Sequence, residues 1–239
     1  MLTWIAARTN RIKVASRVLG VPFRRPAMVA KLAVSLDRLS GGRFILGLGG
    51  GYSDEEIIAL GGPALSPAEK VDGLAEAIQV IRGAWTSSGY TRHGRHHSVR
   101  DLTMEPKPVH PIPVWLGTFG PRALAVTGAL ADGWIPSLGY MPIDELPAMR
   151  HRIDAAAEAA GRRPDEIRSI LNLSIRLGPD ARPRQDDVVT GSAKQAVSQL
   201  RQFLDIGFTG FSFLVDGPDQ MTTMQRITGE VLPALRSTG

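Results

Sequence analysis

Residues 10–56 read NRIKVASRVLGVPFRRPAMVAKLAVSLDRLSGGRFILGLGGGYSDEE, and they contain the clearest secondary-structure signals of the chain. Residues 11–18 are rich in branched side chains, and polar and apolar residues alternate along them, which predicts a strand. Pro26 suits the first turn of a helix, because it has no N–H to leave unpaired, and the two glycines at 41–42 suit the end of that helix. Residues 43–48 predict a second strand, which runs into a glycine loop. The stretch therefore predicts a strand, a helix and a strand in succession.

The same alternation continues along the chain. Further strands are predicted over residues 112–117, 133–136, 168–177 and 211–215, with helices between them, and the polar residues 87–111 form an excursion that suits a hairpin. Six strands that alternate with helices imply right-handed crossovers and a parallel sheet covered by helices. A doubly wound sheet and a (β/α) barrel both satisfy this pattern, although a complete barrel has eight strands.

Composition narrows the class of protein. The 239 residues suit one barrel-sized domain, and 43% hydrophobic with 21% charged residues is typical of a globular protein that buries a core. The absence of cysteine excludes disulfides and thiolate metal sites. The apolar part of residues 1–11 is too short for a signal peptide or a membrane span, so we expect a cytoplasmic protein with no membrane partner. The net charge of +5 comes from scattered arginines without a nucleic-acid-binding motif, so we expect no nucleic acid partner.

Two glycine-rich loops follow predicted strands. Residues 47–52 (GLGGGY) lack the spacing of a dinucleotide-binding fingerprint and the Gly-Lys-Ser/Thr of a nucleoside-triphosphate loop. They form either a tight strand-to-helix turn or a place where the main chain approaches a flat ligand closely. Residues 117–122 (GTFGPR) open a predicted helix, whose free N–H groups and positive dipole end suit a phosphoryl group. Ordinary helix capping explains this second loop equally well.

Other candidate sites have less support. The three histidines within residues 93–97 lie among arginines, and only Asp101 is near as a third ligand, so we expect a solvated loop and no metal. We find neither a lysine suited to Schiff-base chemistry nor a carboxylate pair at the strand ends, which argues against a lyase or isomerase barrel. Arg176 lies near the C-terminal end of a predicted strand, where it either binds an anion or pairs with Asp180.

Read together, residues 10–56 and residues 115–136 (WLGTFGPRALAVTGALADGWIP) resemble the luciferase-like monooxygenase family, and the similarity extends from about Leu2 to the C-terminus. The resemblance implies a single TIM (β/α) barrel domain over residues 1–239, which holds FMN or the deazaflavin coenzyme F-420 (F420) at the C-terminal ends of its strands. It implies a flavin- or F420-dependent oxidoreductase or monooxygenase that acts on a small organic substrate. We prefer F420 because Arg- and Ala-rich relatives of this appearance commonly use it.

The resemblance also assigns cofactor-binding residues. Arg17 and Val18 would form a bulged, often cis, peptide bond behind the ring system, although most relatives have a small residue at the position of Arg17. The first glycine loop would line the ring and the ribityl chain, and the second would hold the phosphate. Arg176 is a further candidate, and no catalytic residue is assigned. The loop residues are Gly49, Gly50, Gly51 and Tyr52 in the first loop and Gly117, Thr118, Phe119 and Gly120 in the second.

Members of the family normally begin with a strand, a helix and a strand that would precede this sequence. The resemblance therefore implies an N-terminally truncated barrel with about six of the eight strands. An open barrel would expose apolar edges, so we expect a homo-oligomer such as a dimer. The substrate-side acid or base of relatives usually lies in the part that would precede this sequence. The alternative function is thus a non-catalytic partner subunit or a cofactor-binding remnant of the same fold.

Overall fold

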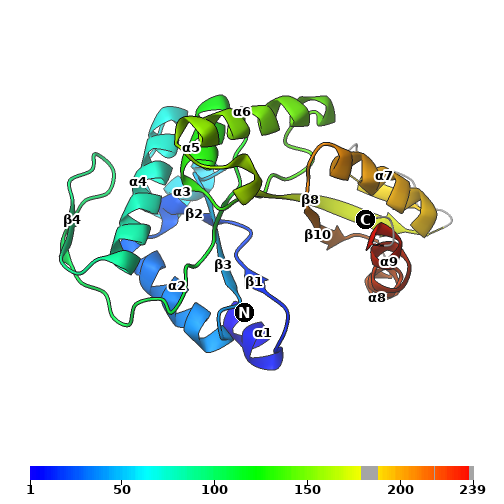
Figure 1. Cartoon of the computed structure of the whole chain (residues 1–239), viewed down its shortest axis with the longest axis horizontal. Coiled ribbons are helices and arrows are strands. Elements are labelled where there is room, and N and C mark those ends of the chain that lie inside the picture. Colours follow the sequence, from blue (N-terminus) through cyan, green and yellow to red (C-terminus); the bar gives the residue numbers. More distant parts are fainter. Residues whose placement is uncertain (179–187, 218, 237–239) are drawn as a thin grey trace. The chain divides into compact units, whose positions relative to one another are not determined.

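The computed structural model describes residues 1–178, 188–217 and 219–236 (Figure 1). The chain forms two compact units, each with its own strands and helices. Unit 1 comprises Met1–Trp134 with Ile153–Ile167, and unit 2 comprises Ile135–Arg152 with Arg168–Gly239. A single barrel domain over the whole chain stays a prediction.

Unit 1 is built around the strand β3. Strands β1 and β2 pair with β3, β6 also pairs with β3, and β7 pairs with β6, and all of these pairs are parallel. The excursion after α4 carries an antiparallel hairpin of β4 and β5, as the sequence predicts. The elements of unit 1 are α1 (Leu2–Arg8), β1 (Val14–Ala15), β2 (Leu19–Gly20), η1 (Val21–Phe23), α2 (Pro26–Ser40), β3 (Phe44–Gly49), α3 (Asp54–Ala59), α4 (Pro67–Thr86), β4 (Tyr90–Arg92), β5 (Val99–Leu102), β6 (Val114–Leu116), α5 (Pro121–Leu130), β7 (Gly133–Trp134) and η3 (Pro164–Glu166).

The first predicted strand is present in two pieces, separated by a bulge. Ala15 pairs with Ile45 and Leu19 pairs with Leu48, so residues 16–18 stand opposite only residues 46–47 of β3. One extra residue on one strand is the definition of a β-bulge. The peptide bond between Arg17 and Val18, inside this bulge, is cis, as the family resemblance implies.

Helix α2 begins and ends where the sequence predicts, and a capping box begins α4. Pro26 is the first residue of α2, and Gly41, in the left-handed conformation at φ 66°, ends it. Ser66 and Glu69 form a reciprocal capping box at the start of α4, in which each side chain satisfies a main-chain N–H. Local sequence signals therefore fix the lengths of the two longest helices of this unit.

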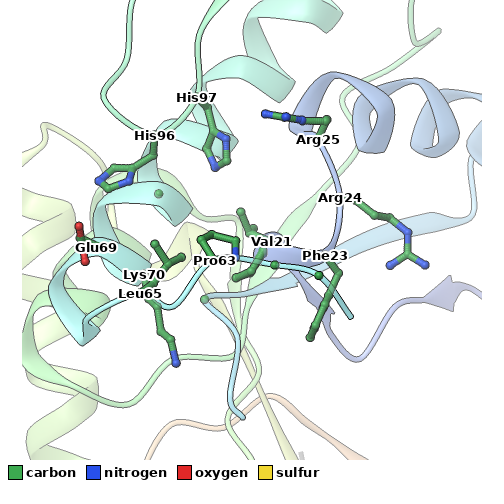
Figure 2. A pocket seen from close by; sticks show the side chains of 15 residues that line it. Val21, Phe23, Arg24, Arg25, Pro63, Leu65, Glu69, Lys70, His96 and His97 are labelled. Carbon is green, nitrogen blue, oxygen red and sulfur yellow. The ribbon is translucent and has the colours of Figure 1, made fainter. Parts of the chain in front are cut away.

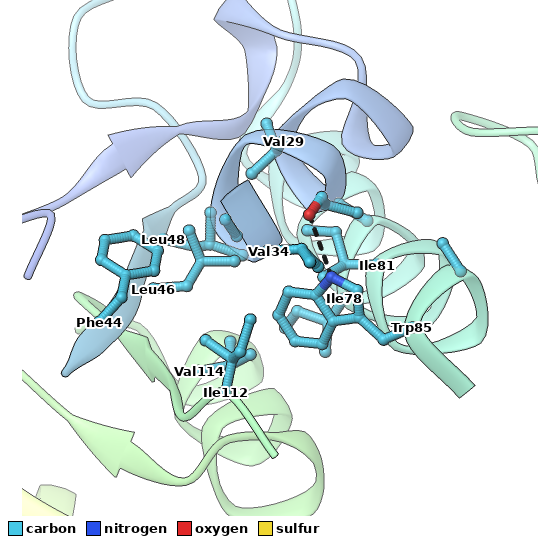
Figure 3. Close-up of a cluster of buried hydrophobic side chains, with 14 of the residues drawn as sticks. Val29, Val34, Phe44, Leu46, Leu48, Ile78, Ile81, Trp85, Ile112 and Val114 are labelled. Carbon is cyan, nitrogen blue, oxygen red and sulfur yellow. Dashed lines mark hydrogen bonds between the residues drawn. The ribbon is translucent and has the colours of Figure 1, made fainter. Parts of the chain in front are cut away.

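The core of unit 1 lies around β3, whose residues are all buried. Apolar side chains of α2, α4 and β6 pack against it, and the Nε1 of Trp85 donates a hydrogen bond of 3.1 Å to the carbonyl oxygen of Ala30 (Figure 3). This bond joins α4 to α2 and satisfies the only polar atom of the buried indole ring. The packing holds the C-terminal end of β3, and with it the first glycine loop, in a fixed position.

Unit 2 is built around β8, which pairs in parallel with both β9 and β10. The sequence predicts β8 and β10 but not β9. The helix α6 (Leu146–Ala159) contributes residues to both units. The other elements of unit 2 are η2 (Ile143–Glu145), β8 (Arg168–Leu177), β9 (Val188–Gly191), α7 (Ala193–Asp205), β10 (Gly210–Val215), α8 (Gln220–Arg226), η4 (Ile227–Val231) and α9 (Leu232–Arg236).

All six predicted strands are thus present, and the α/β class is confirmed. Within the described ranges, no helix combines the length and the apolar character needed to cross a bilayer.

Candidate functional site

The bulge and the first glycine loop meet at Gly47. The hydroxyl of Ser16 donates to the carbonyl oxygen of Gly47 and accepts from its N–H, with both distances 2.9 Å. A Cβ placed on Gly47 would lie 1.9 Å from the carbonyl oxygen of Ser16, so no side chain fits at this position. Gly47 therefore serves the packing of the bulge against β3, not the approach of a ligand.

Three segments that are distant in the sequence converge beyond this point. A Cβ on Gly49 would lie 2.9 Å from Cγ2 of Val18 and 3.8 Å from the carbonyl oxygen of Gly117. The N–H of Gly117 donates to the carbonyl oxygen of Leu48 at 3.1 Å. The structure thus brings together residues that the sequence assigns to the bulge, the first loop and the second loop. Arg17 is exposed beside them.

The remaining residues of the first loop have different surroundings. A Cβ on Gly50 would make only an ordinary contact of 3.5 Å with Lys70. Gly51 has a φ of 94°, which favours glycine, and a Cβ there would approach the side chain of Ile57 to 2.8 Å. Tyr52 is 80% exposed. Gly50 is therefore the glycine whose missing side chain leaves room for a ligand.

In the second loop, the side chain of Thr118 forms a hydrogen bond inside the protein. The hydroxyl oxygens of Thr118 and Thr127 lie 2.7 Å apart, and the Thr127 hydroxyl donates to the carbonyl oxygen of Ala123 at 3.0 Å. A hydroxyl has one proton, so Thr118 is the donor within this pair. The carbonyl oxygen of Thr118 accepts from Nε1 of Trp134 at 2.9 Å. A ligand at this loop would consequently meet the main chain of residues 117–120 and not the Thr118 hydroxyl.

The N-terminus of α5 suits an anionic group. Gly120 is the capping residue, Pro121 follows as the first helical residue, and no side chain caps the helix in the described part of the chain. A Cβ on Gly120 would find no atom within 4 Å, so the space in front of the helix is open. Uncapped N–H groups at the positive end of a helix dipole bind phosphoryl groups well. The residues present therefore fit the phosphate end of a flavin or deazaflavin.

A cavity of about 400 Å³ has Gly50 among its lining residues (Figure 2). It lies between the start of α2, the segment before α4 and the loop of the β4–β5 hairpin. We call it the Arg25–His97 cavity, and the lining residues that matter below are Val21, Phe23, Arg25, Leu65, His96 and His97.

Glu76 on α4 anchors the histidine loop. Its carboxylate accepts hydrogen bonds from the N–H groups of Arg95, His96 and His97 at 3.0, 2.8 and 2.8 Å. Burial acts to raise the pKa of Glu76, but these three hydrogen bonds outweigh it, and the pKa is lowered overall. The loop is therefore an ordered part of the cavity wall.

Sequence reasoning missed this cavity and treated the three histidines as a solvated loop. Burial lowers the pKa of His97, the nearby Glu76 acts in the opposite direction, and the charges of His96 and Arg25 lower the pKa further. Among the described residues, no three His, Cys, Asp or Glu side chains come close enough to hold a metal ion. No local signal in the sequence reveals the anchoring carboxylate, because it lies about twenty residues before the loop.

Arg176 belongs to unit 2. Its guanidinium forms an ion pair with the carboxylate of Asp216, within a half-buried environment. Asp180, the partner considered from the sequence, lies outside the described residues.

The chain is similar to known proteins over nearly its whole length. A family model described as luciferase-like monooxygenase matches residues 1–230. The F420-dependent glucose-6-phosphate dehydrogenase of Nakamurella multipartita is 26% identical in an alignment of 278 positions. The alignment covers 98% of this chain and 80% of the relative.

Solved structures show the same fold. An F420-dependent secondary alcohol dehydrogenase, in complex with an F420-acetone adduct, superposes with a TM-score of 0.88 at 18% identity, over 97% of this chain and 82% of that one. The coenzyme F420-dependent tetrahydromethanopterin reductase of Methanopyrus kandleri superposes with a TM-score of 0.85 at 18% identity, over 98% and 86%. These likenesses confirm the fold predicted from the sequence.

Proposed function

Because this chain belongs to the luciferase-like monooxygenase family, we propose that it is an F420-dependent oxidoreductase acting on a small organic substrate. The similar proteins named above are F420-dependent oxidoreductases, which supports this cofactor over FMN. One observation carries the proposal: the glycine loops after β3 and β6 lie side by side, joined by the hydrogen bond from Gly117 to Leu48, and the second loop ends at an open helix N-terminus.

Each part of this arrangement has a role in the proposal. Val18, Gly49 and Gly50 line the place where the ring system would lie, with the Val18 side chain packed against Gly49. The main chain of residues 117–120 holds the phosphoryl group at the start of α5. F420, when bound, accepts or donates a hydride, and the protein supplies binding and orientation. Arg17, Tyr52 and Arg176 stay predicted cofactor contacts.

The family also includes monooxygenases, but the proposed reaction is hydride transfer. Hydride transfer is supported by the similar proteins, which are two dehydrogenases and a reductase. The alternative of a non-catalytic remnant makes a different prediction, namely cofactor binding without turnover. The expected homodimer and the cytoplasmic location stay predictions, and light scattering on the purified protein tests the first of these.

The test is a titration of the purified protein with F420 and, separately, with FMN, followed by the fluorescence of each ring. We expect F420 to bind with a Kd in the micromolar range or tighter and FMN to bind more weakly. A panel of alcohols and sugar phosphates is then tested for reduction of bound F420. Binding without any reduction favours the remnant, and no fluorescence change with either cofactor contradicts the proposal.

A further inference from the structure

The Arg25–His97 cavity carries an excess of positive charge. Within residues 1–178, 188–217 and 219–236, neither Arg24 nor Arg25 forms an ion pair with a carboxylate. Lys70 in the cavity wall is already paired with Asp54 at 2.6 Å. In Figure 2 the guanidinium of Arg25 extends toward the imidazole of His97, while Arg24 extends in another direction. Arg25 and His97 therefore lie near each other in the cavity wall, where Arg25 supplies the positive charge.

The acidic group in the wall does not neutralise this pair. Glu69 accepts hydrogen bonds from the N–H and the hydroxyl of Ser66 at 3.0 and 2.7 Å, and Arg95 lies 3.7 Å from it. The hydrogen bonds from Ser66, which belong to the helix cap, lower the pKa of Glu69 most, and the charges of Arg95 and His96 in the hairpin loop lower it further. Because its carboxylate is held in this way, Glu69 caps α4 and leaves Arg25 for a ligand.

The opposite part of the wall is apolar. Val21 and Phe23 come from η1, and Leu65 comes from the segment before α4. A volume of about 400 Å³ is within the range of small-molecule sites, which combine an apolar lining with a few polar groups that fix orientation. This lining suits a ligand that has both a carbon skeleton and a charged end.

We propose that the Arg25–His97 cavity is a binding site for a small organic anion, separate from the phosphoryl-binding loop at α5. The anionic group lies near Arg25 and His97, and the carbon skeleton packs against Val21, Phe23 and Leu65. No residue of 117–120 lines this cavity. Gly50 lines both this cavity and the proposed ring surface, so the experiment below includes a competition with F420.

His97 makes the binding dependent on pH. The charged groups that face it are Glu76 on α4, His96 in its own loop and Arg25 at the start of α2. Burial holds the pKa of His97 below its usual value, so the imidazole is neutral at pH 7 in the free protein. A bound anion favours the imidazolium, and we expect affinity to fall as pH rises through the range in which the imidazole loses its proton.

The experiment uses benzenesulfonate as the probe, because its charge is constant over this pH range. Benzenesulfonamide supplies the same skeleton without the charge, and inorganic sulfate supplies the charge without the skeleton. Isothermal titration calorimetry on the full chain without cofactor is expected to show benzenesulfonate binding with a Kd below about 1 mM at pH 6, and both reference probes at least about tenfold weaker.

Two variants and two matched controls locate the site. Arg25→Gln is expected to weaken benzenesulfonate binding at least about tenfold, whereas Arg100→Gln removes the same charge from an exposed position and changes little. His97→Gln is expected to flatten the pH dependence, and His93→Gln, in the same loop but outside the cavity lining, to leave it intact.

Four results would overturn the proposal. The first is that benzenesulfonate does not bind at pH 6, and the second is that Arg25→Gln and Arg100→Gln weaken binding equally. The third is that sulfate binds as tightly as benzenesulfonate. The last is that the probe no longer binds at all when F420 is added at saturation. The last result would show that the cavity is part of the cofactor site. Circular dichroism of each variant confirms that it remains folded.

Discussion

Ser16 satisfies the main chain of Gly47 where the bulge interrupts strand pairing: its hydroxyl oxygen lies 2.9 Å from both the nitrogen and the carbonyl oxygen of Gly47. Both residues are buried. Ser16→Ala leaves a buried N–H and a buried C=O without this partner, so we expect a loss of about 2 kcal/mol in the free energy of unfolding. Urea denaturation measures it. Ser35→Ala, which removes an exposed hydroxyl bonded to Lys31, is the control and should change stability by less than about 0.5 kcal/mol.

Gly47→Ala tests the close approach between the bulge and β3. The new methyl would lie 1.9 Å from the carbonyl oxygen of Ser16, so one of the two strands must move. We expect a loss of about 3 kcal/mol in unfolding free energy, with a matching fall in Tm. Gly229→Ala, where a Cβ would find no atom within 4 Å, is the control and should be tolerated. Equal stability of the two variants would contradict the packing described.

The strands and helix starts of this protein could be predicted, because short-range sequence patterns determine them. The strands at residues 44–49 and 168–177 are uninterrupted or strictly alternating apolar runs. Pro26 and the glycine-proline pair at 120–121 mark helix starts, so six strands and the starts of α2 and α5 follow from sequence. The sequence did not predict β9, a strand of four residues.

The role of each glycine was not predictable in the same way. Gly47 and Gly49 are required by packing against Ser16 and Val18, whereas Gly50 and Gly120 leave room for a ligand. All four look alike in the sequence. Their difference depends on neighbours about 30 or more residues away in the sequence, or on the absence of neighbours, and no local pattern encodes that.

Thr118→Val separates the structural role of this side chain from a role in binding. Its hydroxyl donates to Thr127 inside the protein, so the loss of this buried bond is expected to cost about 1 kcal/mol of unfolding free energy. Because a ligand meets the main chain of the loop, we expect the Kd for F420 to change less than about threefold. A loss of affinity of about tenfold or more would mean that the hydroxyl contacts the cofactor after all.

Acid should release the histidine loop from α4. The pKa of Glu76 is lower in the folded protein than the ordinary value of a glutamate. The ionised carboxylate therefore stabilises the folded state above that ordinary pKa, and this contribution is lost as pH falls through the folded pKa. Glu76→Gln is expected to lower stability by about 1–2 kcal/mol at pH 7, and the difference from the unmodified protein should shrink as the pH falls below about 4.

Urea denaturation of both proteins from pH 3 to pH 7 measures this effect, and amide hydrogen exchange of residues 95–97 reports on the loop directly. Glu158→Gln, on an exposed face of α6, removes the same charge and serves as the control. A constant difference between Glu76→Gln and the unmodified protein over the whole range would be inconsistent with the anchoring role.

The most direct test of the central claim compares Gly120→Asp with Gly120→Asn in a fluorescence titration with F420. Both side chains enter open space and cap α5, so neither should lower the Tm. Aspartate places a negative charge where the phosphoryl group is proposed to bind, and asparagine has nearly the same shape without the charge. We predict that Gly120→Asp weakens F420 binding at least about tenfold more than Gly120→Asn does. Equal affinities for the two variants would contradict a phosphoryl site at the start of α5.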